Sequence, residues 1–193
     1  MDWSSSLGLS SLETIEMARQ YLQEAMKEPT PLAHLVTSSI RSSEGRYQES
    51  IIEATRAIVM DANDPVGYIA MGKALVYAGR PNEGADAIKK AMRLNPNYPD
   101  WYPWSLALAF FTARQYDEAL KVLEETHSPL ARRLLAATYA QAGRLEEART
   151  AAKEYLEVNP NFSIKRYMEL EPYEDPADLE DYLQGLRKAG LPE

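Results

Sequence analysis

The chain has 193 residues, of which 45% are hydrophobic and 26% are charged, a balance typical of a folded soluble domain with a sizeable core. It contains no cysteine, which excludes disulfide bonds, thiolate catalysis and cysteine-ligated metal centres. Its formal net charge of −8, with basic residues dispersed among acidic ones, argues against nucleic acid as a partner, because phosphate binding needs clustered Lys and Arg.

The amino-terminal region, residues 1–30, predicts one helix. Residues 1–11 lack the basic and apolar stretches of a secretory signal, and no later segment is apolar over the length that spans a bilayer. We therefore expect a cytoplasmic chain without a membrane partner. Residues 12–27 have helical periodicity, and Ser10 with Glu13 would form a capping box at the start of this amphipathic helix.

A short phrase then recurs four times along the chain. Its copies end at Ser50, Gly84, Ala119 and Ala148, so they are 34, 35 and 29 residues apart. Each copy joins two stretches with helical periodicity, which predicts a helix, a tight turn and an antiparallel helix in every unit. The fold is expected to be all-α, with units at about 31–62, 65–96, 99–127 and 128–160. Because the last spacing is compressed, the helix that ends near Thr126 should be short.

Capping residues support these boundaries. Four dipeptides place a capping side chain before a proline at the first helical position: Thr30-Pro31, Asp64-Pro65, Ser128-Pro129 and Asp175-Pro176. Gly45, Gly79 and Gly143 supply a permissive backbone where the first helices of their units end.

Residues 31–160 resemble the tetratricopeptide repeat family, whose period is 34 residues. The second unit carries the family's signature residues: Tyr68, Met71, Gly72, Leu75, Gly84, Ile88, Ala91 and Pro96. The equivalent close-packing positions of the other units are all small: Ser38, Ala107 and Ala136 on first helices, and Ser50, Ala119 and Ala148 on second helices. The resemblance implies a right-handed α-solenoid. Helices at 163–170 and 177–188, within the region 161–193, are expected to form a capping pair at its open end.

A narrower resemblance rests on residues 97–104 and on the tail, residues 172–193. Together they are similar to the repeat region that follows the catalytic domain in some bacterial class III adenylate or guanylate cyclases. This resemblance implies an alternative role as a regulatory or dimerising segment of a multidomain cyclase-like signalling protein. The repeats account for nearly the whole chain, so no cyclase catalytic domain fits within it.

In the repeat family, the first helices of successive units line a concave groove that holds the ligand. Carried over position by position, the groove residues are Leu35, Ser39, Ile69, Lys73, Tyr77, Trp101, Trp104, Leu108, Phe111, Arg133 and Ala137. Such an apolar, aromatic surface would bind an amphipathic helix or an extended peptide of a protein partner. Two alternatives stay open: the aromatic residues pack between repeats or under the C-terminal helices, or a second copy of the chain covers them in a homodimer.

Specialised ligand sites and catalysis are not expected. The chaperone-binding subclass of the family needs Lys and Asn where this chain has Leu35, Ser39 and Ile69. The two histidines, His34 and His127, lie in different units, so neither has metal-ligand spacing around it. With no phosphate-binding glycine loop either, we expect a non-enzymatic protein without a cofactor.

Overall fold

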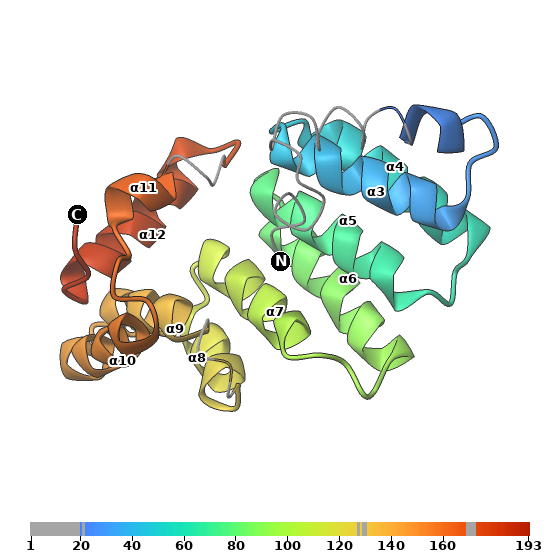
Figure 1. The fold of residues 1–193 in the computed structure, drawn as a ribbon. Coiled ribbons are helices and arrows are strands. Elements are labelled where there is room, and N and C mark those ends of the chain that lie inside the picture. Colours follow the sequence, from blue (N-terminus) through green and yellow to red (C-terminus); the bar gives the residue numbers. More distant parts are fainter. Residues whose placement is uncertain (1–19, 21, 127, 129–130, 169–172) are drawn as a thin grey trace.

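The computed structural model describes residues 20, 22–126, 128, 131–168 and 173–193, and in this part of the chain every regular element is a helix. The predicted all-α solenoid is confirmed (Figure 1). Most of the helix predicted over residues 12–27 lies outside the described residues, which show helix there at residue 20 and at 22–25.

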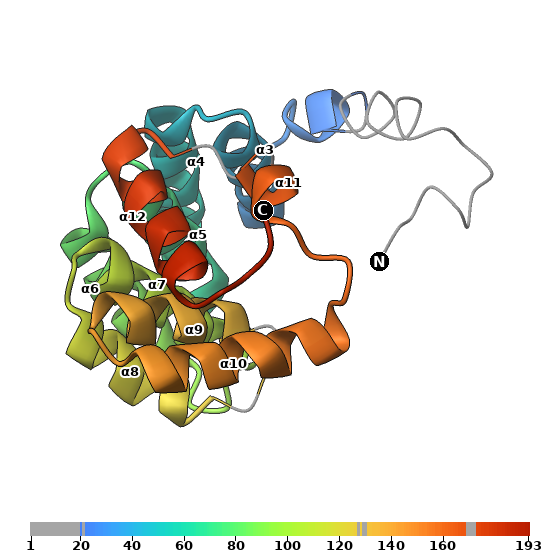
Figure 2. The ribbon, with the colours of Figure 1, turned by 90° about the vertical axis from the view of Figure 1, so that its left-hand side faces the viewer.

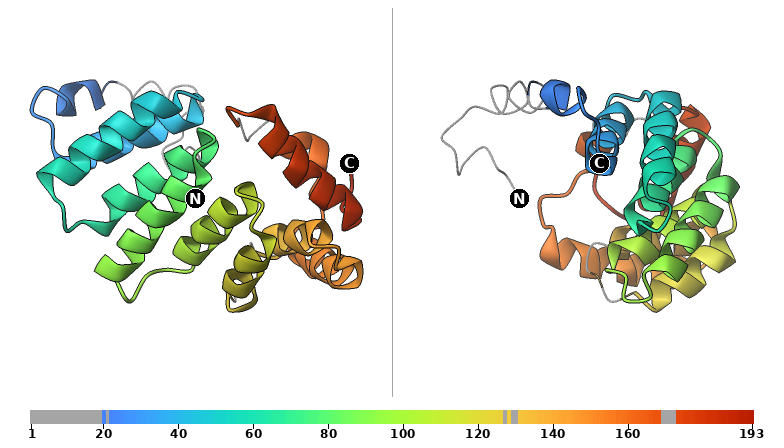
Figure 3. Two further views of the ribbon diagram at one scale, coloured as in Figure 1. Left: turned by 180° about the vertical axis from the view of Figure 1, so that it is seen from behind. Right: turned by 90° about the vertical axis from the view of Figure 1, so that its right-hand side faces the viewer.

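Four antiparallel helix pairs form the body of the solenoid. They are α3 (Pro31–Ser43) with α4 (Tyr47–Met60), α5 (Pro65–Tyr77) with α6 (Pro81–Leu94), α7 (Trp101–Thr112) with α8 (Tyr116–Glu124), and α9 (Ala131–Gln141) with α10 (Leu145–Val158). Each pair packs on the next, so the pairs follow one another around an arc (Figures 1 and 3). Helix α8 has 9 residues where α4, α6 and α10 have 14, which confirms the short helix predicted before residue 127.

The predicted capping residues start three of the helices. The Thr30 hydroxyl accepts a hydrogen bond from the Ala33 amide at 3.2 Å, and the Asp64 carboxylate accepts one from Val66 at 2.9 Å. Asp175 does the same for Ala177 at 2.8 Å. Each bond satisfies an amide that has no partner inside the helix. Pro129, from the fourth predicted pair, lies outside the described residues.

The two helices of the second unit approach so closely that only glycine fits at their crossing. A Cβ atom on Gly72 would lie 2.9 Å from the Gly84 carbonyl oxygen, and one on Gly84 would lie 2.7 Å from the Gly72 carbonyl oxygen. In the first unit, serines stand at these positions and are buried. They fit because the Ser50 hydroxyl donates a hydrogen bond of 2.8 Å to the Ser38 carbonyl oxygen. In the first two units, the small residues predicted for close packing therefore have that role.

The turns inside the four units share one backbone conformation. Gly45, Gly79 and Gly143 have φ values of 72°, 71° and 80°, in the left-handed region that favours glycine. The third unit has Arg114 at the equivalent position, with φ of 58°. This arginine therefore holds a conformation that costs a side-chain-bearing residue about 1–2 kcal/mol.

The arginine is kept there by α12 (Pro176–Lys188), which follows the short helix α11 (Ile164–Met168) at the C-terminal end of the chain (Figure 2). Arg114 donates to the Asp178 carboxylate at 2.9 Å, and Tyr116 donates to Asp181 at 2.8 Å. Helix α12 packs on α9 so closely that a Cβ on Gly185 would lie 2.8 Å from the Ala137 carbonyl oxygen. The helix predicted at 177–188 is thus present as a cap on the fourth unit.

Candidate functional site

Six of the predicted groove residues line one pocket. It has a volume of about 410 Å³ and runs between α3 and α5 toward the start of α7. The six are Leu35, Ser39, Ile69, Lys73, Tyr77 and Trp101. Leu35 and Ile69 are buried and form its apolar base, whereas the exposed Lys73 and Ser39 stand at its rim. These six residues, carried over from the family resemblance, therefore lie around one pocket.

A second, smaller pocket continues this surface toward the fourth unit. Its volume is about 260 Å³, and Trp101, Trp104, Arg133 and Tyr155 contribute to its lining. Trp101 lines both pockets and is 45% exposed, an unusual fraction for so large an apolar side chain. The first and second pockets together are called the concave groove below.

Three predicted groove residues are buried and do not reach this surface, and α12 covers two of them, Phe111 and Ala137. Phe111 is 1% exposed, and its ring packs edge-on against Tyr182 with the centroids 5.3 Å apart. Leu108 is 3% exposed, and Ala137 is fully buried against Gly185. A partner cannot contact these three buried side chains in this conformation, so the accessible groove is shorter than the sequence predicts.

The tail also closes the groove beside Tyr77. The Tyr173 ring meets the Tyr77 ring edge-on at 4.9 Å, and the Glu174 amide donates to the Tyr77 carbonyl oxygen at 3.0 Å. Of the two alternatives for the aromatic residues, packing under the C-terminal helices therefore holds for Phe111, whereas Tyr77 packs against the segment just before α12. It does not hold for Trp101.

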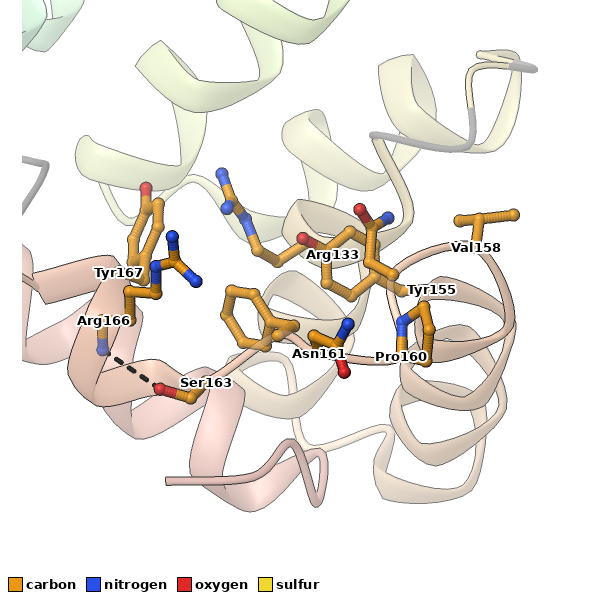
Figure 4. Close-up of a pocket in the computed structure, with 10 residues that line it drawn as sticks. Arg133, Tyr155, Val158, Pro160, Asn161, Ser163, Arg166 and Tyr167 are labelled. Carbon is orange, nitrogen blue, oxygen red and sulfur yellow. Dashed lines mark hydrogen bonds between the residues drawn. The ribbon is translucent and has the colours of Figure 1, made fainter.

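Arg133 lies at the far end of the groove, inside a cage of aromatic rings (Figure 4). Its guanidinium carbon is 4.0 Å from the Tyr167 ring centroid, 5.8 Å from that of Phe162 and 6.0 Å from that of Tyr155. Its Nε donates to the Tyr182 hydroxyl at 3.1 Å. Burial works against the charged form, but Tyr182, Tyr167 and Tyr155 outweigh it, and the pKa of Arg133 is raised above its ordinary value.

Beyond Arg133 the structure shows a third pocket, also of about 410 Å³, that the sequence did not reveal. Its walls come from the end of α10, the turn at residues 159–163 and helix α11, and they include Phe162, Arg166 and Tyr167. One feature of the sequence does point to this site. No acidic residue stands three or four positions from Arg133, so Arg133 cannot form an ion pair with a carboxylate along its own helix.

In the described part of the chain, no three His, Asp or Glu side chains cluster as metal ligands. His34 instead pairs with Glu53, with 2.6 Å between Nδ1 and Oε2, and both side chains are largely buried. Within the same residues, none of the helices combines the length and apolarity needed to cross a bilayer.

Comparison with known proteins supports one family. Two family models, each described as tetratricopeptide repeat, match residues 69–129 and 110–167, which together span just over half of the chain. The sequence matches no curated protein.

Solved structures share the fold at low sequence identity. The thermophilic TPR protein TTC0263 from Thermus thermophilus superimposes with a TM-score of 0.68 at 22% identity, over 92% of this chain and 93% of that one. YrrB, described as a TPR protein with an unusual peptide-binding site, gives 0.58 at 20% identity, over 87% and 90%. MamA gives 0.56 at 20% identity, over 79% and 91%. Identities this low establish similarity of fold alone.

Proposed function

Because the chain belongs to the tetratricopeptide repeat family, we propose that it is a protein-interaction module that binds a peptide or partner domain in the concave groove. The observation that carries this proposal is the exposure of Trp101 at the point where both pockets of the groove meet. Trp, Tyr and Arg are the residue types that most often dominate binding energy at interfaces. Trp101, Trp104 and Arg133 lie together here.

The shape and chemistry of the groove favour an extended or helical segment. Its base is apolar, at Leu35 and Ile69, and its rim carries hydroxyl groups from α3 and the single ammonium group of Lys73. Ligand sites commonly combine an apolar lining with a few polar groups that set orientation. An apolar anchor on the partner would fill the space beside Trp101, while its backbone would bond to the polar rim.

Selection of peptides tests this proposal directly. A random peptide display library is panned on the immobilised full chain, and the enriched peptides are titrated by fluorescence anisotropy. We expect Trp101→Ala and Trp104→Ala to weaken binding at least tenfold each, which corresponds to about 1.4 kcal/mol. Tyr98→Ala is the matched control, since Tyr98 is an exposed aromatic residue outside the pockets that form the groove. Peptides that bind all three variants as they bind the unaltered chain would refute the proposed groove.

The narrower cyclase-associated role remains a second proposal, supported by residues 97–104 and by the tail. In its dimerising form it requires two copies of the chain to associate. Light scattering over a hundredfold range of concentration distinguishes the two proposals, because a strict monomer contradicts the homodimer and leaves peptide binding intact.

A further inference from the structure

The pocket beyond Arg133 has an unusual charge. Most arginines in the described residues have a carboxylate oxygen within 4.0 Å. Three do not: Arg93, Arg133 and Arg166. Arg133 and Arg166 line the same pocket, and no acidic side chain contributes to its lining. In a chain with a net charge of −8, this pocket brings together two arginines that have no carboxylate partner among the described residues.

The structure holds Arg133 in place without neutralising it. Stacking on Tyr167 and the hydrogen bond to Tyr182 fix the guanidinium plane. The bond uses Nε–H alone, so the N–H groups of Nη1 and Nη2 have no partner in the described residues. Across those residues, no fully buried side-chain nitrogen or oxygen lacks a hydrogen bond, so both Nη atoms must be reached by solvent. Arg133 therefore keeps N–H donors on Nη1 and Nη2 that the described residues leave unused.

Arg166 supplies a second cation at the mouth of the pocket. Its backbone N–H donates to the Ser163 hydroxyl at 3.1 Å, which fixes the first turn of α11, and its side chain is exposed (Figure 4). The rings of Phe162 and Tyr155 also line the pocket and make part of its wall apolar. A ligand that fits must carry a negative group next to an apolar one.

We propose that this pocket binds a carboxylate of the peptide ligand, with Arg133 forming a two-bond contact and Arg166 completing the charge. The planar donors of a guanidinium match the two oxygens of a carboxylate, and such charge-assisted pairs are about twice as strong as neutral hydrogen bonds. The inference rests on the proposed function, because the carboxylate belongs to a ligand whose adjacent segment runs into the groove. Arg133 and Tyr155 line both pockets and connect them.

Small probes test the pocket independently of the groove. The full chain, labelled with ¹⁵N, is titrated with N-acetylphenylalanine, with its amide, and with N-acetylglutamate α-amide, while the arginine Nε–Hε resonances are followed by NMR. We expect saturable shifts at Arg133 and Arg166 with at least one of the two carboxylates, and a response at least tenfold weaker with N-acetylphenylalaninamide. The carboxylate that binds more tightly shows whether a chain terminus or an acidic side chain is recognised.

Variants assign the effect to the pocket. Arg166→Gln changes an exposed side chain and should weaken carboxylate binding at least fivefold without changing the thermal midpoint. Arg133→Lys keeps the charge but loses the planar donors, and should weaken binding at least tenfold. Arg93→Gln is the matched control, because it removes an arginine that also lacks a carboxylate partner but lies outside this pocket.

Three outcomes would overturn the inference: equal binding of the acid and the amide, tighter binding of inorganic phosphate than of either carboxylate, or equal effects of Arg166→Gln and Arg93→Gln. If these occur while display-selected peptides still need Trp101 and Trp104, the carboxylate site fails and the proposed groove stands. If the carboxylate probes bind but no peptide needs the two tryptophans, the groove fails instead.

Discussion

The left-handed turn at Arg114 allows a direct measurement of strain in this solenoid. Replacing Arg114 by Gly or by Ala removes the same ion pair with Asp178, and the two variants differ in one Cβ atom. Ala would pay about 1–2 kcal/mol to hold φ near 58°. Gly avoids that cost but has about 0.5–1 kcal/mol more conformational entropy to lose on folding. We therefore expect Arg114→Gly to be more stable than Arg114→Ala by about 1 kcal/mol.

The equivalent turn in the fourth unit provides the reverse experiment. Gly143 has φ of 80°, and a Cβ atom built on it would meet nothing within 4 Å, so Gly143→Ala adds strain without a clash. The substitution should cost about 1 kcal/mol for the same reason. Asp178→Asn removes the ion pair and leaves the Arg114 backbone unchanged. We expect this variant to lose about 1 kcal/mol of stability or less, because one partner of the pair is exposed. That loss measures the ion pair alone, without the backbone strain.

Thermal unfolding by circular dichroism is sufficient as the assay. A difference of about 1 kcal/mol shifts the midpoint by roughly 2–4 °C in a chain of this size. The variants with Gly and Ala at position 114 should differ by that amount, with Gly higher, and Gly143→Ala should lie lower than the unaltered chain by a similar amount. Equal midpoints for the two variants at position 114 would show that this turn is not strained, and the reasoning would fail.

Three further predictions concern the cap and the core. Gly185→Leu should separate α12 from α9, because even a Cβ would lie 2.8 Å from the Ala137 carbonyl oxygen, and hydrogen exchange should then accelerate in α12 but not in α5. Burial, followed by the hydrogen bond to Asp181, raises the pKa of Tyr116 to about 12, so its contribution to stability is complete below about pH 10 and is lost as pH rises through about 12. The free energy of unfolding should therefore fall less steeply with pH over that interval in Tyr116→Phe than in the unaltered chain. Ile88→Ala should cost about 2–5 kcal/mol in denaturant unfolding, because the side chain is fully buried between the helices of the second unit.

Local chemistry made most of the solenoid predictable. The caps at Thr30, Asp64 and Asp175 act within three residues, so each helix start can be read from a short stretch of sequence. The close approach of Gly72 and Gly84 recurs at a regular spacing, which indicates the pairing of helices without any knowledge of the third dimension. The groove residues proposed on α3, α5 and α7 come from the resemblance to the repeat family, in which the first helix of each unit lines the groove.

The position of α12 could not be predicted, because it depends on contacts between residues far apart in the chain. Arg114 and Asp178 are separated by 64 positions, and Arg133 and Tyr182 by 49. A helical period shows that 177–188 has one apolar face, but it does not say which helix that face covers. Phe111 was predicted to line the groove for the same reason: the sequence does not show that α12 packs on its ring.

The cap links the stability of the solenoid to the form of the proposed ligand site. The open end of a repeat array exposes an apolar face that must be covered, and α12 does this by burying Leu183, Leu186 and Phe111. The same helix carries Tyr182, which accepts the Nε–H of Arg133 and so orients the guanidinium toward its pockets. Substitutions on α12 should therefore change which ligand is preferred without altering any residue of the groove. Tyr182→Phe, which keeps the ring but removes the acceptor, separates the orienting role of this helix from its packing role.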